Sequence, residues 1–148
     1  MRIGVYGSAA GEINEESGAK AREIGREIIL RGHDLITGAG SGLPYDAVKA
    51  ACEARTNQKG RIIGYSPAVS LEEHLDFGMP IEGFDSFSFI DENFSYLLKG
   101  ARLKLRNVFS VNSCDSTVFI SGRIGSMNEF TNAYDMGKNI GILTGTEG

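Results

Sequence analysis

Short apolar runs alternate with longer segments of helical periodicity along the whole of this sequence. Strands are expected at Ile3–Gly7, Asp34–Thr37, Arg61–Tyr65, Phe84–Ile90, Ser116–Ile120 and Ile140–Leu143. Helices are expected at Glu15–Arg31, Pro44–Arg55, Asn93–Asn112 and Met127–Gly137. Because parallel neighbours in a sheet need crossover connections, this alternation predicts a doubly wound, Rossmann-like α/β fold with a mainly parallel sheet and helices on both faces. We expect residues 1–148 to form a single domain of this kind.

One connection departs from the alternation. Residues 66–83, between the third and fourth expected strands, show no helical periodicity, so we expect a loop that lies over a neighbouring surface. His74 lies in this segment beside Glu72, Glu73 and Asp76, and without a second ligand spacing it is expected to be a solvated loop residue.

The net charge, the cysteines and the lengths of the apolar runs indicate which partners and sites to expect. The formal net charge is −4, which lacks the basic excess of a non-specific nucleic-acid binder, so no nucleic acid is expected. Cys52 and Cys114 have no CxxC partner, and we expect two buried thiols and no metal site. No apolar run approaches the roughly 20 residues of a membrane span, so the expected location is the cytoplasm, away from membranes.

Loops rich in glycine and small residues follow the first, second and fifth expected strands, at residues 7–11, 38–42 and 121–126. Ligands of parallel sheets bind outside the carboxyl ends of the strands, and glycine lets the backbone approach a ligand closely. A helix that starts behind such a loop adds free N–H groups and a positive dipole end, which together bind phosphate. The candidate nucleotide-binding residues are Gly7, Ser8, Gly38, Gly40, Ser41, Gly42, Gly122, Arg123, Gly125 and Ser126.

Any one of these loops is equally well explained as a packing turn, and Ser8 and Ser126 as turn and helix-cap residues. Three such loops at one sheet edge favour a nucleotide site. We therefore expect the three loops to converge on one cleft that binds a nucleotide phosphate.

The third loop and the helix before it resemble motifs of the Lonely guy (LOG) family. Residues Gly122–Glu129 resemble the signature PGGxGTxxE, with Ser121 in place of the proline. Residues Leu103–Asn107 resemble the helical segment Met-x-x-Arg-Lys, and Thr37–Leu43 resembles the family's GGGxxGLM turn. Val5–Ser8 is similar to the opening strand and loop, so the resemblance covers nearly the whole chain.

The resemblance implies a Rossmann-like homodimer, or a higher homo-oligomer, that hydrolyses the N-glycosidic bond of an AMP-like nucleoside 5′-monophosphate to base and ribose 5-phosphate. It assigns catalysis to Arg106, which positions the substrate, and to Glu129, which stabilises positive charge on the ribose or activates water. No metal or other cofactor is required. Many relatives are called lysine decarboxylase-like, but no lysine here lies in a recognisable pyridoxal-phosphate setting.

Each candidate also has a structural interpretation. The spacing of Ser126 and Glu129 is that of a capping box, a role that can coexist with catalysis. On sequence alone, Arg106 is a solvated helical arginine. Arg123, which replaces a glycine of the signature, either pairs with the phosphate or fills the space that the phosphate needs.

Three functions therefore compete. The leading hypothesis is the phosphoribohydrolase. The alternative is a non-catalytic carrier or sensor that binds a nucleotide or the molybdenum cofactor. It is favoured by the departures from the family motifs at Ser121, Arg123 and Asn107. Asn107 replaces the lysine of the family's helical segment. The third is a degenerate relative kept for subunit interactions.

Overall fold

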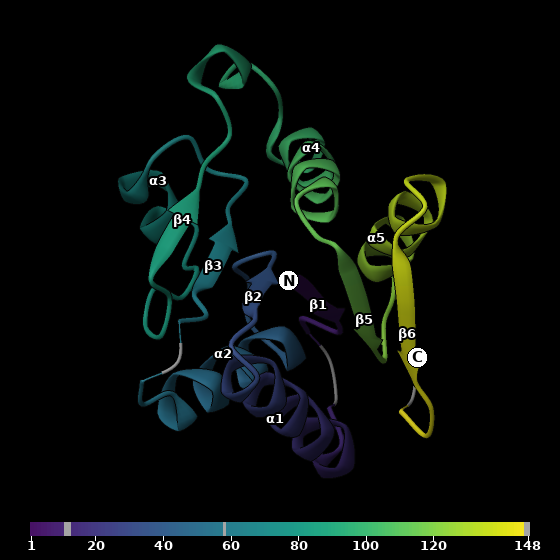
Figure 1. The fold of residues 1–148 in the computed structure, drawn as a ribbon. Coiled ribbons are helices and arrows are strands. Elements are labelled where there is room, and N and C mark those ends of the chain that lie inside the picture. The colour runs from purple at the N-terminus through teal and green to yellow at the C-terminus, as the bar shows by residue number, and fades with distance from the viewer. Residues whose placement is uncertain (11–12, 58, 147–148) are drawn as a thin grey trace.

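A parallel sheet forms the centre of the molecule (Figure 1). The computed structural model describes residues 1–10, 13–57 and 59–146, and in this part of the chain six strands pair in the order β4-β3-β2-β1-β5-β6, every pair parallel. The strands are β1 (Arg2–Gly7), β2 (Asp34–Thr37), β3 (Ile62–Tyr65), β4 (Ser86–Ser88), β5 (Ser116–Ile120) and β6 (Asn139–Leu143). The predicted α/β fold with a parallel sheet is confirmed.

Helices cover both faces of the sheet, as predicted (Figure 1). They are α1 (Glu15–Leu30), α2 (Leu43–Ala54), the short α3 (Leu71–Asp76), α4 (Lys99–Asn112) and α5 (Ile124–Asp135). On one face, Val5 belongs to a buried cluster with residues of α1 and α2. On the other face, Tyr6 packs with residues of α4 and α5. The alternation of neighbouring strand residues between the two faces thus puts Tyr6 on the α4/α5 side.

The chain order of the strands creates a switch point beside β1. The chain builds outward from β1 through β2 and β3 to β4, then returns to place β5 on the other side of β1. The carboxyl ends of β1 and β5 lie next to each other, because Gly7 pairs with Ile120. Connections on the two sides of this point run in opposite directions and open a crevice above the strand ends, which is where ligands bind in such folds.

The expected loop over residues 66–83 is wrong in part, because it contains α3. Ser70 caps this helix by accepting from the Glu73 N–H at 3.2 Å. His74 is fully buried and not solvated: its Nε2 lies 3.0 Å from the Pro80 carbonyl oxygen, and its Nδ1 lies 2.9 Å from Ser66 Oγ. The His74 ring also packs against Phe87 of β4. A six-residue helix is too short for its periodicity to show in the sequence.

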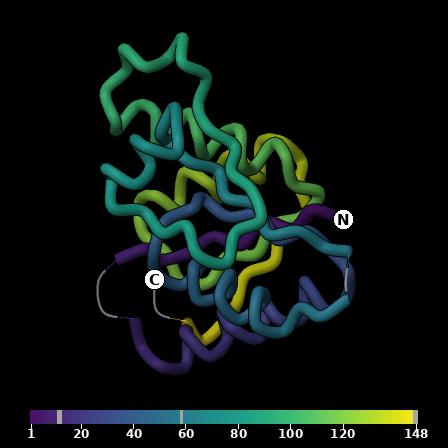
Figure 2. Tube along the Cα trace, turned by 90° about the vertical axis from the view of Figure 1, so that its left-hand side faces the viewer, coloured from purple at the N-terminus to yellow at the C-terminus, as the bar shows by residue number. Residues whose placement is uncertain are grey.

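Other predicted boundaries also change. The expected helix over residues 93–112 divides into a 3₁₀ turn, η1 (Glu92–Phe94), and α4, and the segment between β4 and α4 extends away from the sheet (Figures 1 and 2). The fourth strand is shorter than predicted, and α5 begins three residues earlier, at Ile124 instead of Met127. Cys114 is buried as predicted and its burial raises the pKa of the thiol, but Cys52 is exposed.

An ion pair joins α3 to α4. Arg102 is buried, and its guanidinium donates to both carboxylate oxygens of Glu73, at 2.8 and 2.9 Å. The carboxylate also accepts from the Val69 N–H at 2.8 Å. Arg102 lies one helical turn before Arg106, so this pair fixes the part of α4 that carries Arg106.

We expect Glu73→Gln to lower the free energy of unfolding by about 2 kcal/mol at pH 7, because it leaves the buried Arg102 without a counter-charge. The control Glu72→Gln alters an exposed neighbour and should change stability by less than about 0.5 kcal/mol. The hydrogen bond from Arg102 lowers the pKa of Glu73 below its ordinary 4.5, so its stabilising contribution should be lost as the pH falls through that lowered pKa. Urea unfolding at pH 7 and pH 3 measures both effects, and equal losses in the two variants at pH 7 would contradict them.

Candidate functional site

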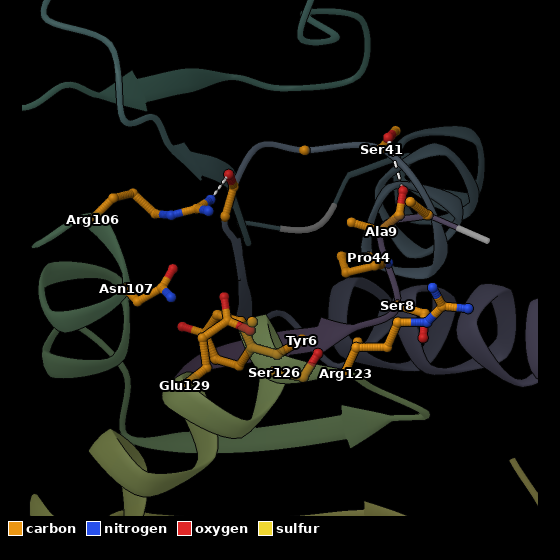
Figure 3. Close-up of a pocket in the computed structure, with 15 residues that line it drawn as sticks. Tyr6, Ser8, Ala9, Ser41, Pro44, Arg106, Asn107, Arg123, Ser126 and Glu129 are labelled. Carbon is orange, nitrogen blue, oxygen red and sulfur yellow. Dashed lines mark hydrogen bonds between the residues drawn. The ribbon is translucent and has the colours of Figure 1, made fainter. Parts of the chain in front are cut away.

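The loops after β1, β2 and β5 line one pocket at the switch point, with a volume of about 260 Å³ (Figure 3). The predicted convergence of the three loops is confirmed, because Gly7, Gly40 and Gly125 all line this pocket. Its other lining residues are Tyr6, Ser8, Ala9, Ala10, Gly38, Ser41, Pro44, Arg106, Asn107, Arg123, Ser126 and Glu129. Gly11, at the end of the first loop, lies outside the described residues.

Two of the candidate residues, Gly42 and Gly122, do not line the pocket. They instead allow backbone conformations and close contacts that other residues would not. Gly42 has φ of +81° and precedes α2, and a Cβ there would lie 2.3 Å from the Ser8 carbonyl oxygen. Gly122 has φ of +156°, and a Cβ would lie 2.8 Å from that of Ser126. Both positions therefore require glycine for a turn or a close approach.

Tyr6, Pro44 and Asn107 line the pocket although nothing in the sequence marks them as site residues. The alternation along the first strand places Tyr6 on the α4/α5 side, but only the sheet order shows that this side borders the pocket. In the sequence, Asn107 is only a departure from a family motif, and its place in the pocket depends on how α4 packs against α5.

The first turn of α5 faces the pocket with free backbone donors. Its N-cap residue is Arg123, which makes no side-chain cap. The N–H groups of Ile124, Gly125 and Ser126 have no hydrogen-bond partner in the described part of the chain, and the first satisfied one is Met127, which donates to the Arg123 carbonyl at 2.9 Å. The predicted capping box of Ser126 and Glu129 is therefore wrong, since both lie inside the helix. Free N–H groups at a helix N-terminus form an anion-binding arrangement.

The three loops are joined to one another. Ser8 Oγ and Ser121 Oγ are hydrogen-bonded at 3.1 Å, and Ser41 Oγ donates to the Ala9 carbonyl oxygen at 3.2 Å. Ser121 has φ of +56°, a conformation closed to proline, whose ring holds φ near −65°. The backbone conformation at Ser121 is therefore one that the proline of the LOG signature could not adopt.

Arg106 is held at the pocket by backbone carbonyls. Its Nη1 donates to the Gly38 carbonyl oxygen at the end of β2 and to that of Tyr65 at the end of β3. Its Nε is buried and has no partner among the described residues, and burial lowers the pKa of the guanidinium. The interpretation of Arg106 as a solvated surface arginine is therefore wrong.

Glu129 lies at the inner wall of the pocket and is 8 % exposed. Within the described residues, no hydrogen bond or ion pair reaches its carboxyl group, although Arg106 and Lys104 contribute opposing positive charge. Burial raises the pKa of Glu129 to about 7. This carboxyl group can therefore gain or lose a proton near neutral pH, a property common at functional sites.

The two ends of the pocket differ in chemistry (Figure 3). Arg106, Asn107 and Glu129 lie at one end, and Ser8, Ser41 and Arg123 lie at the other. In the described part of the chain, no group of three or more His, Cys, Asp or Glu side chains is placed to hold a metal ion. None of the described helices has the length and apolar character needed to cross a bilayer.

Sheet order, switch point and glycine-lined pocket together define a class: a Rossmann-like α/β protein with a candidate ligand site at the carboxyl ends of its strands. The model of the SLOG cluster4 family matches residues 1–148, and the chain belongs to this family. The resemblance to the LOG enzymes is thus supported at the level of the SLOG family. No curated protein matches the chain.

Several solved structures share the fold. The molybdenum cofactor carrier protein of Chlamydomonas reinhardtii is 24 % identical with a TM-score of 0.71, and the match covers 96 % of this chain and 75 % of that one. The molybdenum cofactor binding protein of Rippkaea orientalis is 21 % identical, with a TM-score of 0.72 and coverage of 95 % and 74 %. DNA processing protein A of Helicobacter pylori is 16 % identical, with a TM-score of 0.72 and coverage of 99 % and 68 %.

At these identities the likeness shows the fold alone. The Helicobacter pylori structure is described by its single-stranded DNA binding mode, so the comparisons do not support our exclusion of nucleic acid. None of these three proteins is described as a hydrolase.

Proposed function

We propose that this protein binds a nucleoside monophosphate or a similar phosphorylated small molecule in the pocket, as a carrier or sensor. The observation that carries the proposal is the first turn of α5, where the N–H groups of Ile124, Gly125 and Ser126 are free beside three loops of small residues. A phosphate there receives several charge-assisted hydrogen bonds and the favourable end of the helix dipole.

Other predicted site residues fit the same ligand pose. Gly40 leaves open space at the pocket, because a Cβ there would meet nothing within 4 Å, and the hydroxyl groups of Ser8 and Ser126 line the pocket and can donate to a phosphate. Ser41, whose hydroxyl donates to the Ala9 carbonyl, instead holds the second loop to the first. Arg123 lies at the phosphate end with Ser8 (Figure 3). The two molybdenum cofactor proteins with this fold support a binding role ahead of a hydrolytic one.

We expect AMP to raise the melting temperature of the protein with increasing concentration, because a ligand that binds only the folded state stabilises it by mass action. Adenosine should have much less effect, because the proposed recognition depends on the phosphate. Thermal unfolding with AMP, adenosine and inorganic phosphate measures this. Equal shifts with AMP and adenosine would contradict the phosphate assignment, and tighter AMP binding by Arg123→Gly would show that Arg123 obstructs the site.

N-glycosidic hydrolysis is a second candidate, and the position and raised pKa of Glu129 favour it. The ionised carboxylate would take a proton from water as the water oxygen bonds to the ribose C1′ and the C1′–N bond breaks. The base would then leave with that same proton, which returns the carboxylate to its ionised form. Release of ribose 5-phosphate from AMP by the parent, lower by about 10²–10⁴-fold in Glu129→Gln, would identify this activity. AMP binding without release would identify the carrier or sensor.

The homo-oligomer implied by the family resemblance stays a prediction, which light scattering on the purified protein measures.

A further inference from the structure

We propose that Asn107 determines specificity by accepting a hydrogen bond from an O–H or N–H group of the ligand, at the end opposite the phosphate. This inference rests on the proposed function. It concerns the far end of the same pocket, where Asn107 projects from α4 between Arg106 and Glu129 (Figure 3).

One of the two polar side-chain atoms of Asn107 makes a hydrogen bond within the described part of the chain and the other does not. Its side-chain nitrogen Nδ2 donates to Asn128 Oδ1 of α5 at 2.9 Å. This bond fixes the orientation of the Asn107 amide. Its oxygen Oδ1 is buried and has no partner among the described residues, and the residue as a whole is only 3 % exposed. A hydrogen-bond acceptor is therefore held inside the pocket wall with nothing to accept from.

A buried amide oxygen without a hydrogen-bond donor raises the free energy of the unliganded protein. A ligand that supplies the donor removes this penalty on binding. The neighbouring groups define what else the ligand presents. The Glu129 carboxyl group also has no partner in the described part of the chain, while the Arg106 guanidinium is a donor. The far end of the pocket therefore fits a group that both donates and accepts, such as a ribose hydroxyl or the amino-bearing edge of a base. A purely apolar group leaves the Asn107 oxygen and the Glu129 carboxyl group without a partner.

Asn107 also changes the chemistry relative to the LOG motif that this segment resembles. Lysine, the residue of that motif, carries only donors, whereas the asparagine here offers an acceptor. At the end of the pocket opposite the phosphate, a lysine would favour a ligand group that accepts a hydrogen bond. Asn107 should instead favour a ligand group that donates one.

The test compares dissociation constants of AMP, 2′-deoxy-AMP, 3′-deoxy-AMP and IMP by titration calorimetry. The deoxy ligands each lack one ribose hydroxyl, and IMP replaces the amino group of the base by a carbonyl oxygen. We expect the ligand that lacks the donor for Asn107 to bind the parent roughly ten-fold more weakly than AMP. In Asn107→Leu, which keeps a similar side-chain volume without the acceptor, this difference should disappear. In Asn128→Asp, the matched control, an oxygen acceptor for the Asn107 amide nitrogen remains, so Asn107 keeps its orientation and the difference should persist.

Each outcome decides the inference. Equal affinities of the four ligands for the parent would overturn it while leaving the phosphate assignment intact. Discrimination that persists in Asn107→Leu would also overturn it. Absence of binding by every monophosphate would overturn the proposed function and this inference with it. If circular dichroism shows that Asn107→Leu does not fold, Asn107→Asp keeps an acceptor, and loss of the discrimination in that folded variant would overturn the inference.

Discussion

Gly125→Leu is expected to weaken AMP binding by about 100-fold or more without harming the fold. Gly125 is the second residue of α5 and lines the pocket, and a Cβ at this position would meet nothing within 4 Å. A leucine there occupies the space beside the free N–H groups and so removes two or more charge-assisted hydrogen bonds to the phosphate, each worth about 1.5–3 kcal/mol. Leucine also favours a helix over glycine, so the melting temperature of the free protein should not fall.

The chain offers a closely matched control, Gly100→Leu. Gly100 is the second residue of α4, a Cβ there would also meet nothing within 4 Å, and it is not among the lining residues of the pocket. AMP affinity, measured by calorimetry, should equal that of the parent. If Gly125→Leu also binds AMP as the parent does, the phosphate does not sit at the start of α5.

Glu129→Gln should remove a strong pH dependence of stability. The folded state raises the pKa of Glu129 from 4.5 to about 7, so between these values it binds more protons than the unfolded state. The free energy of unfolding of the parent should therefore fall as the pH rises through this window, by about 3 kcal/mol in total. Glutamine has no proton to lose, so the stability advantage of the variant should grow from pH 4.5 to pH 7 and then stay constant.

Urea unfolding at intervals from pH 4.5 to pH 8 measures the difference between parent and variant. The control is Glu23→Gln, which makes the same chemical change at an exposed residue of α1. A difference between parent and Glu129→Gln that does not change with pH would mean that the carboxyl of Glu129 is not protonated in the folded protein near neutral pH.

The fold could be predicted because its signals are local. The strands β2 and β5 contain the consecutive apolar residues Leu35–Ile36 and Val118–Ile120, a pattern typical of strands in a sheet that is covered on both faces. Once the sheet is parallel, the meeting of the glycine-rich loops follows, since their strands end at one edge. Ten of the twelve candidate site residues consequently line one pocket, and only Gly42 and Gly122 do not.

Features that depend on tertiary contacts could not be predicted. The motif at Ser126 and Glu129 has capping-box spacing, yet the positive φ values of Ser121 and Gly122 turn the chain early and start α5 at Ile124. His74 carries no pattern in sequence, because its burial depends on Ser66, Pro80 and Phe87, which pack around it only in the folded chain. The free oxygen of Asn107 likewise arises from the pairing of α4 with α5.

The pocket wall combines the ends of β1 and β2 with side chains of α4 and α5, which come from opposite parts of the sequence. A molecule seated there would act as a crosslink between the two halves of the chain, because neither half can separate from the other without releasing it. Occupancy should therefore slow hydrogen–deuterium exchange far beyond the atoms in contact, in the strands that flank the switch point and in both helices. The fraction of protein with bound ligand could therefore be measured from the exchange protection of backbone amides that do not contact the ligand.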